Sequence, residues 1–303
     1  MDRPTIRRPQ GRQARRERLA VEPPTAEAAA SATPSNGPDS KGPCHDLALL
    51  ASAIPHRVAL AGGWIDQPFV SALNPEPPGS MVVVALEPGF WFMDRCGMAT
   101  STRRVATRIW NGALPDRPRA ELVRELYCAE NNGKAEPSGS QDMVGLIYPG
   151  ISRLDYDARI EEGRFPAHVG SICDPAVARW VERVLSLVPI NQRPAGYTPL
   201  GIRNLDPAWI AQLGRTGRDC FEAIVNTDLR RLGAALNHCM RCWEAILPQT
   251  VRHPAIALDL KAILSWFQSR YPGAMFSGCG GGYMIVVSDE PVPGSLRVRV
   301  RLG

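Results

Sequence analysis

The sequence predicts an α+β fold of two lobes, and three observations support this prediction. The chain has 303 residues, which is enough for two lobes that share a sizeable core. Residues 45–165 mix strand-like apolar runs with helical segments, whereas residues 166–303 have mainly helical periodicity and end in strand-like segments. We therefore expect a first lobe over residues 45–165 and a helix-rich second lobe over residues 166–303.

The composition is that of an ordinary globular protein, with 44% apolar and 21% charged residues. The longest apolar runs, such as residues 81–86, fall far below the roughly 18 residues that cross a bilayer. The start of the chain also lacks the apolar block of a secretory signal. We therefore expect a cytoplasmic protein without a membrane span.

Residues 1–44 differ from the rest in composition, and we expect them to form a disordered tail. Seven of the first twenty residues are arginine, and Pro, Ser, Gly and Ala dominate from residue 21 to residue 43. A basic segment can also bind nucleic acid or an anionic membrane, or direct organelle import. Residues 1–42 hold eight Lys/Arg and five Asp/Glu, a net charge of +3, which leaves +2 of the chain's +5 for the remainder. We therefore expect no nucleic-acid partner for the body.

The eight cysteines have no regular spacing, and we expect reduced thiols. Cys239 and Cys242 form a Cys-x-x-Cys pair beside His238 within a segment of helical periodicity. A zinc site and a pair of buried helix cysteines are the two interpretations. The second is favoured because no other Cys/His pair lies nearby in the sequence.

The hydrophobic pattern places the secondary structure in order along the chain. In the first lobe we expect strands over residues 54–61 and 81–86, a helix from Thr100 or Ser101 toward Trp110, a helix over residues 119–130, a Gly/Ser/Asn-rich loop through Ser140 and an apolar stretch over residues 143–151. In the second lobe we expect helices over residues 176–188, 207–213, 218–246 and 256–268, and strands over residues 283–288 and 295–301.

Four segments have residue types that suit binding or catalysis. The first, residues 56–68, is a strand that runs into Gly62 and Gly63 and then Asp66. Glycines allow a tight turn beside a ligand, and an ionised aspartate accepts several hydrogen bonds from sugar hydroxyls. The alternative is an ordinary turn with a solvated aspartate.

The second segment, residues 96–102, places Gly97, Thr100 and Ser101 at the start of a predicted helix. Unpaired backbone N–H groups and the helix dipole make such a start an anion site, so phosphate can bind there. The alternative is that Thr100 or Ser101 is only an N-cap.

The third segment, residues 137–150, contains Gln141 and Asp142 after a Gly/Ser-rich loop. An aspartate that stays ionised beside a basic side chain can accept the proton of a hydroxyl as phosphorus is attacked. A loop aspartate that caps the next segment is the alternative. The fourth segment, residues 273–283, has three consecutive glycines, which allow either close approach of a ligand or a flexible hairpin.

In order and wording, these segments resemble the motifs of the GHMP kinase superfamily, and the resemblance covers roughly residues 54–290. The Ala-Gly-Gly-Trp-x-Asp wording ending at Asp66 is most similar to the branch of L-fucose and heptose phosphate kinases. The second segment resembles the phosphate loop, but Ala99 replaces its second glycine and residues 92–95 replace its usual lead-in. The third also departs, at Met143 and Pro149.

The resemblance implies a role for each matching residue. It implies a two-lobed GHMP kinase fold, with a shortened N-terminal lobe because only about thirty residues separate the first two motifs. The implied roles are catalysis by Asp142 as base and Arg57 beside the developing alkoxide, substrate binding by Asp66, Gly63 and Trp64, binding of ATP phosphates by Gly97, Ala99, Thr100, Ser101, Gly278, Gly280 and Gly281, and magnesium binding by Ser101 and Glu130.

The function expected from the resemblance is ATP- and Mg²⁺-dependent phosphorylation of a hydroxyl on a sugar or sugar phosphate. Similarity to the fucose and heptose branch implies the anomeric hydroxyl as the acceptor. Two alternatives stay open at this point. One is a kinase for a non-sugar alcohol, and the other is a catalytically silent GHMP-like protein that senses a nucleotide or sugar.

Overall fold

The computed structural model describes residues 51–278 and 280–303. The predicted tail over residues 1–44 lies outside the described residues, as do the first residues of the expected N-terminal lobe. In the described part of the chain, no helix is long and apolar enough to cross a membrane.

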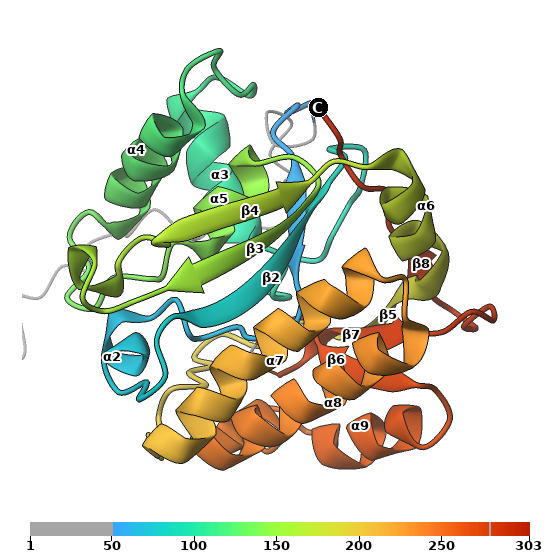
Figure 1. The fold of residues 1–303 in the computed structure, drawn as a ribbon. Helices are drawn as coiled ribbons and strands as arrows, with labels where there is room; N and C mark the ends of the chain where they lie inside the picture. Colours follow the sequence, from blue (N-terminus) through green and yellow to red (C-terminus); the bar gives the residue numbers. More distant parts are fainter. Residues whose placement is uncertain (1–50, 279) are drawn as a thin grey trace, which may run out of the picture. The chain divides into compact units, whose positions relative to one another are not determined.

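The described chain contains both helices and strands, as Figure 1 shows. In order they are β1 (His56–Ala59), α2 (Pro68–Ser71), β2 (Gly79–Leu86), α3 (Thr100–Ile109), α4 (Arg119–Asn131), α5 (Gln141–Ile147), β3 (Ile151–Tyr156), the 3-10 helix η1 (Glu161–Gly163), β4 (His168–Ile172), α6 (Pro175–Val184), β5 (Leu185–Asn191), α7 (Pro207–Val225), α8 (Leu229–Ile246), the 3-10 helix η2 (Pro248–Thr250), α9 (Leu260–Gln268), β6 (Gly273–Phe276), β7 (Gly282–Val287) and β8 (Leu296–Arg297).

The first sheet is antiparallel and has the strand order β1-β2-β3-β4. Val82 and Val84 of β2 face a hydrophobic core that includes α7 and α8, whereas Met81 and Val83 face a second core with α3, α4 and α5. Successive side chains of a strand point to opposite faces, so β2 is buried on both sides. This explains why β2 is an uninterrupted apolar run in the sequence.

The second sheet is also antiparallel and has the strand order β6-β7-β5-β8. Helices α8 and α9 pack on β6, and α6 packs on β5. Met275 of β6 and Ile285 of β7 belong to the same core as Val82 and Val84 of the first sheet. The two sheets therefore share one continuous apolar interior, and the α+β prediction is confirmed.

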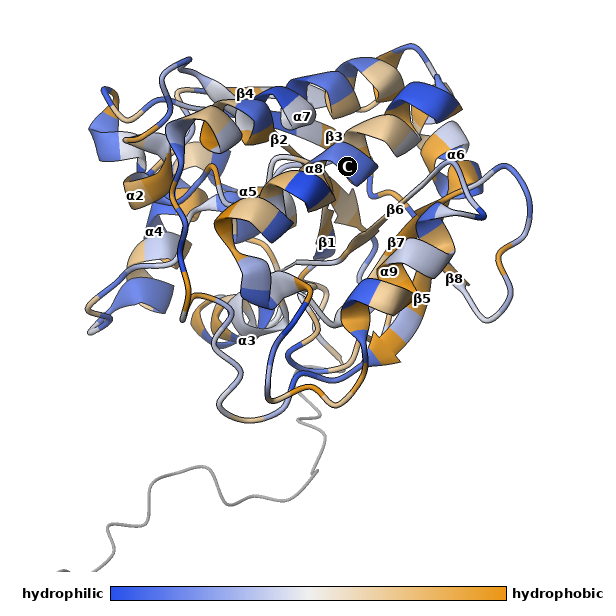
Figure 2. Ribbon diagram, turned by 90° about the horizontal axis from the view of Figure 1, so that it is seen from below, coloured by the Kyte–Doolittle hydropathy of each residue, from blue (hydrophilic) through white to orange (hydrophobic). Residues whose placement is uncertain are grey.

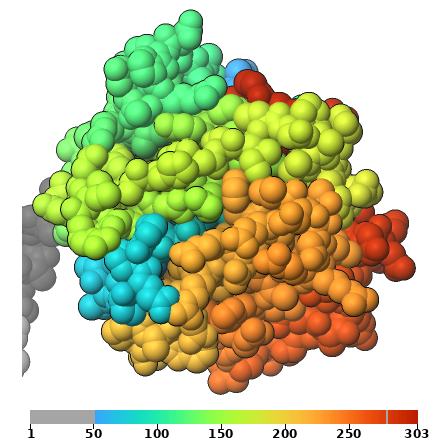
Figure 3. Space-filling view, viewed as in Figure 1, coloured from blue at the N-terminus to red at the C-terminus, as the bar shows by residue number. Residues whose placement is uncertain are grey.

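Helices α7 and α8 pack against each other, with α7 on β2 and β3 of the first sheet and α8 on β6 and β7 of the second. Figure 2 shows apolar and polar residues alternating along both helices, and in Figure 3 the surface of α7 borders that of β3. The prediction of one helical run over residues 218–246 is wrong at its middle. There Thr227 has a φ of 51°, and the Asp228 side chain accepts a hydrogen bond from Arg231 N at 3.0 Å and begins α8.

Other boundaries of the second half also differ from the prediction. The helix expected over residues 176–188 ends at Val184, and β5 follows it without a loop. The helix expected from residue 256 begins at Leu260, because Asp259 accepts a hydrogen bond from Ala262 N at 2.9 Å and caps it. The strand expected over residues 295–301 is only Leu296–Arg297, with one further bridge from Leu86 to Val300.

Cys239 and Cys242 are buried on α8, and both thiols are free. The described residues contain no group of three or more His, Cys, Asp or Glu side chains that could hold a metal ion. The interpretation as buried helix cysteines therefore accounts for this pair.

Gly217 lets α7 approach β2 more closely than any other residue would allow. A Cβ at Gly217 would lie 1.9 Å from the carbonyl oxygen of Ser80 and 2.6 Å from Met81 Cα. Helix propensity alone favours alanine over glycine by about 1 kcal/mol. At this position the close contact outweighs that preference, since α7 would have to move off the sheet.

We expect Gly217→Ala to lower the free energy of unfolding by about 3 kcal/mol, measured by urea denaturation. Gly89→Ala is the matched control, because a Cβ there meets nothing within 4 Å, and we expect it to change stability by less than about 0.5 kcal/mol. A Gly217→Ala protein as stable as the control would contradict the close packing of α7 on β2.

Candidate active site

A cavity of about 290 Å³ brings the sequence segments singled out above together. Its lining includes residues of the first, second and third segments and one glycine of the fourth. It also includes Arg193, which follows β5, and Trp243 of α8. The lining residues are Arg57, Ala59, Gly63, Trp64, Asp66, Gln67, Arg95, Gly97, Ala99, Thr100, Ser101, Ser138, Gly139, Gln141, Asp142, Arg193, Trp243 and Gly278.

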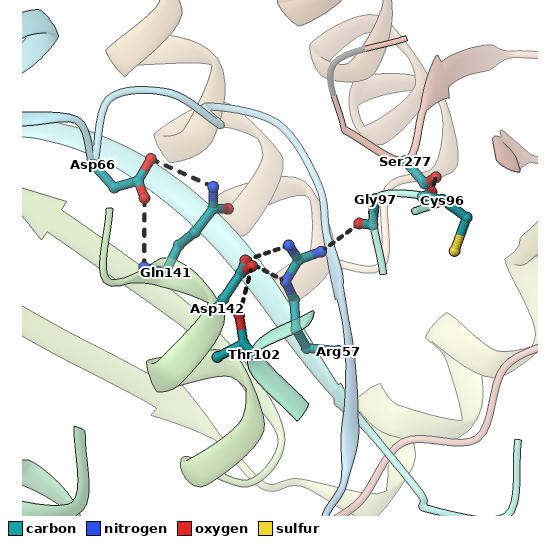
Figure 4. Close-up of polar contacts among 8 residues, drawn as sticks. All are labelled: Arg57, Asp66, Cys96, Gly97, Thr102, Gln141, Asp142 and Ser277. Carbon is teal, nitrogen blue, oxygen red and sulfur yellow. Dashed lines mark hydrogen bonds and ion pairs between the residues drawn. The ribbon is translucent and has the colours of Figure 1, made fainter. Parts of the chain in front are cut away.

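Arg57 and Asp142 form an ion pair at the centre of this cavity (Figure 4). Arg57 comes from β1, and its Nε donates to Asp142 Oδ1 at 3.0 Å. Its Nη2 contacts the same oxygen, and its Nη1 donates to the carbonyl oxygen of Gly97 at 2.8 Å. Thr102 Oγ1 donates to the other carboxylate oxygen of Asp142 at 3.3 Å. The Arg57 side chain is 6% exposed and that of Asp142 23%, so the carboxylate is the member of the pair that a ligand can reach.

Asp142 lies in the first turn of α5, and the interpretation as a loop aspartate is therefore wrong. Ser140 is the N-cap residue of α5, and no side chain caps the helix. The helix packs directly on β1 because Gly145 has no side chain. A Cβ there would lie 2.9 Å from Arg57 Cβ. This contact fixes the position of Asp142 relative to Arg57.

Asp66 also lines the cavity, where its side chain is fully buried and contacts Gln141. Gln141 N donates to Asp66 Oδ2 at 3.5 Å, and Gln141 Nε2 donates to Oδ1 at 3.4 Å. Burial, and then the nearby Asp142 carboxylate, raises the pKa of Asp66 from 3.8 to about 7. The sequence predicted an ionised aspartate, whereas burial of this carboxyl favours its protonated form.

The second and fourth segments meet through their backbones, as Figure 4 shows for Ser277 and Cys96. Ser277 Oγ donates to the carbonyl oxygen of Cys96 at 2.7 Å. Gly97 has a φ of +80°, and a Cβ there would lie 1.9 Å from the carbonyl oxygen of Ser277. A Cβ at Gly282 would likewise lie 2.1 Å from the carbonyl oxygen of Cys96. Only glycine fits these positions.

The predicted helix start after Gly97 is confirmed, but the N-cap residue is Ala99 and not Thr100 or Ser101. Ala99 has a left-handed backbone with φ 54° and ψ 29°, and no side chain caps the helix. The first backbone N–H groups of α3 therefore have no capping side chain beside the cavity. Such groups, together with the helix dipole, fit a phosphate.

The structure leaves two predicted phosphate-binding glycines outside the cavity lining. Gly278 lines the cavity, but Gly280 and Gly281 do not. Gly280 packs against the carbonyl oxygen of Thr250, and Gly281 lies beside Asn191 and Ile256. In this structure both shape the loop between β6 and β7.

The two predicted magnesium ligands are placed differently. Ser101 lines the cavity, whereas Glu130 does not. Glu130 Oε2 is buried without a hydrogen-bond partner in the described part of the chain. Burial, and then the Asp142 carboxylate, raises the pKa of Glu130, and hydrogen bonding to Thr102 opposes that shift. A site with one hydroxyl and one carboxylate nearby fits Mg²⁺ only when phosphates and water supply the other ligands.

Sequence reasoning missed three residues that build the site. Arg193, after β5, lines the cavity, but no motif singles it out. Thr102 binds Asp142 and directly follows Ser101, so it could have been included with the helix start. Trp243 of α8 belongs to none of the four segments, yet its Nε1 donates to the carbonyl oxygen of Gly63 at 2.9 Å.

Solved structures of kinases share this arrangement of helices and sheets. Galactokinase from Lactococcus lactis, solved with galactose, superposes with a TM-score of 0.53 at 12% identity, over 78% of this chain and 84% of the galactokinase. A mevalonate kinase superposes with a TM-score of 0.50 at 12% identity, over 77% of this chain and 90% of that kinase. The chain therefore has the α+β fold of GHMP kinases, as the sequence predicted.

The comparisons do not single out the fucose and heptose branch. A D-glycero-D-manno-heptose 1-phosphate kinase from Bacteroides thetaiotaomicron superposes with a TM-score of 0.47 at 10% identity, over 82% of this chain and 95% of that kinase. No model of a protein family matches the chain, and no curated protein matches it.

The raised pKa of Asp66 predicts a stability that falls as pH rises. Between pH 3.8 and about 7 the native state holds a proton that the unfolded chain has lost. Each rise of one pH unit in this range therefore lowers the free energy of unfolding by about 1.4 kcal/mol. We expect Asp66→Asn to remove this loss. As pH rises from 5 to 8, the free energy of unfolding of Asp66→Asn should increase by about 2–3 kcal/mol relative to that of the wild type, measured by urea denaturation. Exposed Asp116→Asn is the control, and equal pH profiles for wild type and Asp66→Asn would contradict a neutral Asp66.

The left-handed backbone of Ala99 predicts an unusual response to glycine. A non-glycine residue in this conformation is strained by about 1–2 kcal/mol, which offsets the entropy that glycine loses on folding. We expect Ala99→Gly to leave the free energy of unfolding unchanged or to raise it by up to about 1 kcal/mol. Ala234→Gly, at an exposed position inside α8, should instead lower it by about 1 kcal/mol. Equal losses in urea denaturation would show that Ala99 is not strained.

Proposed function

We propose that this protein is an ATP- and Mg²⁺-dependent kinase that phosphorylates a hydroxyl of a sugar or sugar phosphate. The observation that carries the proposal is the contact of Arg57 with both Asp142 and Gly97 in one cavity. A carboxylate that can accept a proton, a fixed cation and an uncapped helix start thus lie side by side. Phosphoryl transfer needs this combination, because its catalysis is mainly positioning and charge neutralisation.

Asp142 acts as the base in this proposal, and Arg57 stabilises charge on the acceptor oxygen. The ion pair with Arg57 and the hydrogen bond from Thr102 orient the carboxylate toward the cavity. When the acceptor hydroxyl loses its proton to Asp142, Arg57 stands beside the developing alkoxide. A strong base is not needed, since proton transfer can accompany attack on phosphorus.

The acceptor binds at the Asp66 end of the cavity. Gln141 uses its Nε2 on Asp66, while its Oε1 is buried and has no hydrogen-bond partner in the described residues. This oxygen is available to accept a hydrogen bond from an acceptor hydroxyl. Asp66 then orients Gln141, and Gly63 and Trp64 form the adjoining wall. The galactokinase with the same fold was solved with galactose, which supports a sugar acceptor.

The phosphates of ATP bind at the start of α3, between Gly97 and Gly278. Thr100 and Ser101 line the cavity there, and no side chain caps the helix. A magnesium ion bound with the phosphates would neutralise charge on them. Ser101 would bind this magnesium ion. Glu130 Oε2, which has no hydrogen-bond partner among the described residues, would contribute negative charge near Thr102. As the similarity to fucose and heptose kinases implies, the anomeric hydroxyl is the proposed acceptor.

A catalytically silent sensor is the second candidate function. Ala99, at the place of a phosphate-loop glycine, and the raised pKa of Asp66 favour it. The mevalonate kinase with the same fold keeps a third candidate open, a kinase for a non-sugar alcohol.

A turnover experiment separates these functions. Purified full-length protein is supplied with ATP, Mg²⁺ and a panel of neutral sugars, sugar phosphates and non-sugar alcohols. We expect turnover with a sugar or sugar phosphate, and Asp142→Asn should lower kcat by at least about 100-fold, the usual effect of losing a general base.

Exposed Asp116→Asn serves as the control in that experiment, with unchanged kcat. Full activity of Asp142→Asn would remove Asp142 from the role of base. Nucleotide binding without turnover over the whole panel would instead establish the sensor.

A further inference from the structure

Arg193 is the cavity residue that no sequence motif explains. It follows β5, and its guanidinium Nε donates to the carbonyl oxygen of Gly280 at 2.7 Å. The guanidinium also lies over the ring of Tyr197, 5.5 Å from its centre. These two contacts fix the group in place from one side.

Arg193 also lines the cavity and has one donor without a partner in the described part of the chain. Its Nη2 is buried and has no hydrogen-bond partner among the residues that the structure describes. A buried charged donor without a partner is unfavourable, because it has lost its hydrogen bonds to water. The cost is removed when an anion binds. The other central arginine differs, because Arg57 donates to Asp142 and to Gly97.

The position of Nη2 shows which part of the cavity it serves. It lies 3.0 Å from the point that a Cβ would occupy on Gly97, and 3.0 Å from the corresponding point on Gly278. The absence of side chains at both glycines therefore leaves room for the guanidinium beside the start of α3. Gly97 is also the residue whose carbonyl oxygen binds Arg57. The chain of contacts from Arg193 to Asp142 thus passes through only Gly97 and Arg57.

We propose that Arg193 binds the terminal phosphate of the nucleotide and stabilises it during transfer. This inference rests on the proposed function, in which phosphates bind at the start of α3. Of the nucleotide's phosphates, the terminal one must lie nearest the hydroxyl that Asp142 activates. The free Nη2 beside Gly97 is on that side of the helix start.

The chemical step shows what Arg193 would contribute. A bond forms between the acceptor oxygen and the terminal phosphorus, while the bond from that phosphorus to its bridging oxygen breaks. The electron pair stays on the bridging oxygen, which leaves with ADP, and the acceptor's proton passes to Asp142. Charge on the terminal phosphoryl oxygens is spread during this exchange, and a fixed guanidinium stabilises it.

Nucleotide binding to the full-length protein tests this role. Isothermal titration calorimetry with Mg²⁺ compares the β,γ-imido analogue of ATP with ADP for the wild type, Arg193→Gln and Arg193→Lys. We expect Arg193→Gln to weaken binding of the ATP analogue at least tenfold and binding of ADP less than threefold. Arg193→Lys keeps the charge and should recover part of the loss. The ratio of the two affinities does not depend on the fraction of folded protein, so a partly unfolded variant still gives an answer.

Exposed Arg252, outside the cavity lining, supplies the control Arg252→Gln, with both affinities unchanged. Equal weakening of the ATP analogue and ADP would overturn the assignment to the terminal phosphate. So would an Arg193→Gln protein that binds the analogue normally but has a raised KM for a phosphorylated acceptor, which would place Arg193 on the acceptor's phosphate. A wild type that binds neither nucleotide would overturn the proposed function itself.

Discussion

The ion pair between Arg57 and Asp142 is the interaction on which the rest of the site depends. Arg57 is almost fully buried, and a buried cation without a partner is strongly unfavourable. Its donors are satisfied by a carboxylate on α5 and by the carbonyl oxygen of Gly97. One side chain on β1 thereby fixes the position of α5 relative to the loop before α3. The base and the proposed phosphate site therefore cannot move independently.

Too few positive charges lie near the carboxyl groups around this ion pair for all of them to ionise easily. Burial raises the pKa of both Asp66 and Glu130, and the Asp142 carboxylate raises them further. Asp142 holds the ion pair with Arg57, while Asp66 and Glu130 lie on either side of it with weaker partners. An added magnesium ion or a cationic donor would favour their ionised forms. Binding of such a ligand and release of protons are thus coupled in this site.

The sequence predicted the fold class and most of the cavity lining, because both depend on local patterns. The buried strand β2 is a continuous apolar run, and the turns at Gly62 and Gly97 need glycine. Prediction from the sequence failed where residues that are close only in space determine the structure. Nothing local separates α6 from β5, since the chain passes from Val184 to Leu185 without a turn residue, and pairing with β7 makes the second segment a strand.

The site shows the same division between local and spatial information. Arg193 belongs to no motif, and only the fold brings it to Gly97. The burial that raises the pKa of Asp66 likewise involves residues far along the chain, such as Gly139, against which the carboxyl packs. The proposed lobe boundary near residue 165 and the shortened N-terminal lobe stay predictions.

The backbone contacts of Gly97 with Ser277 and of Gly282 with Cys96 have a consequence for how new acceptors could evolve. Here the spacing is set by main-chain thickness, so no exchange of side chains can narrow it further, and any enlargement separates the loop before α3 from Ser277 and Gly282. Gln67 and Ser138 line the same cavity, and neither position requires glycine. Under the proposed function, acceptor range and phosphate binding can therefore change at separate positions, and a gene duplicate could acquire a new substrate while keeping its nucleotide chemistry.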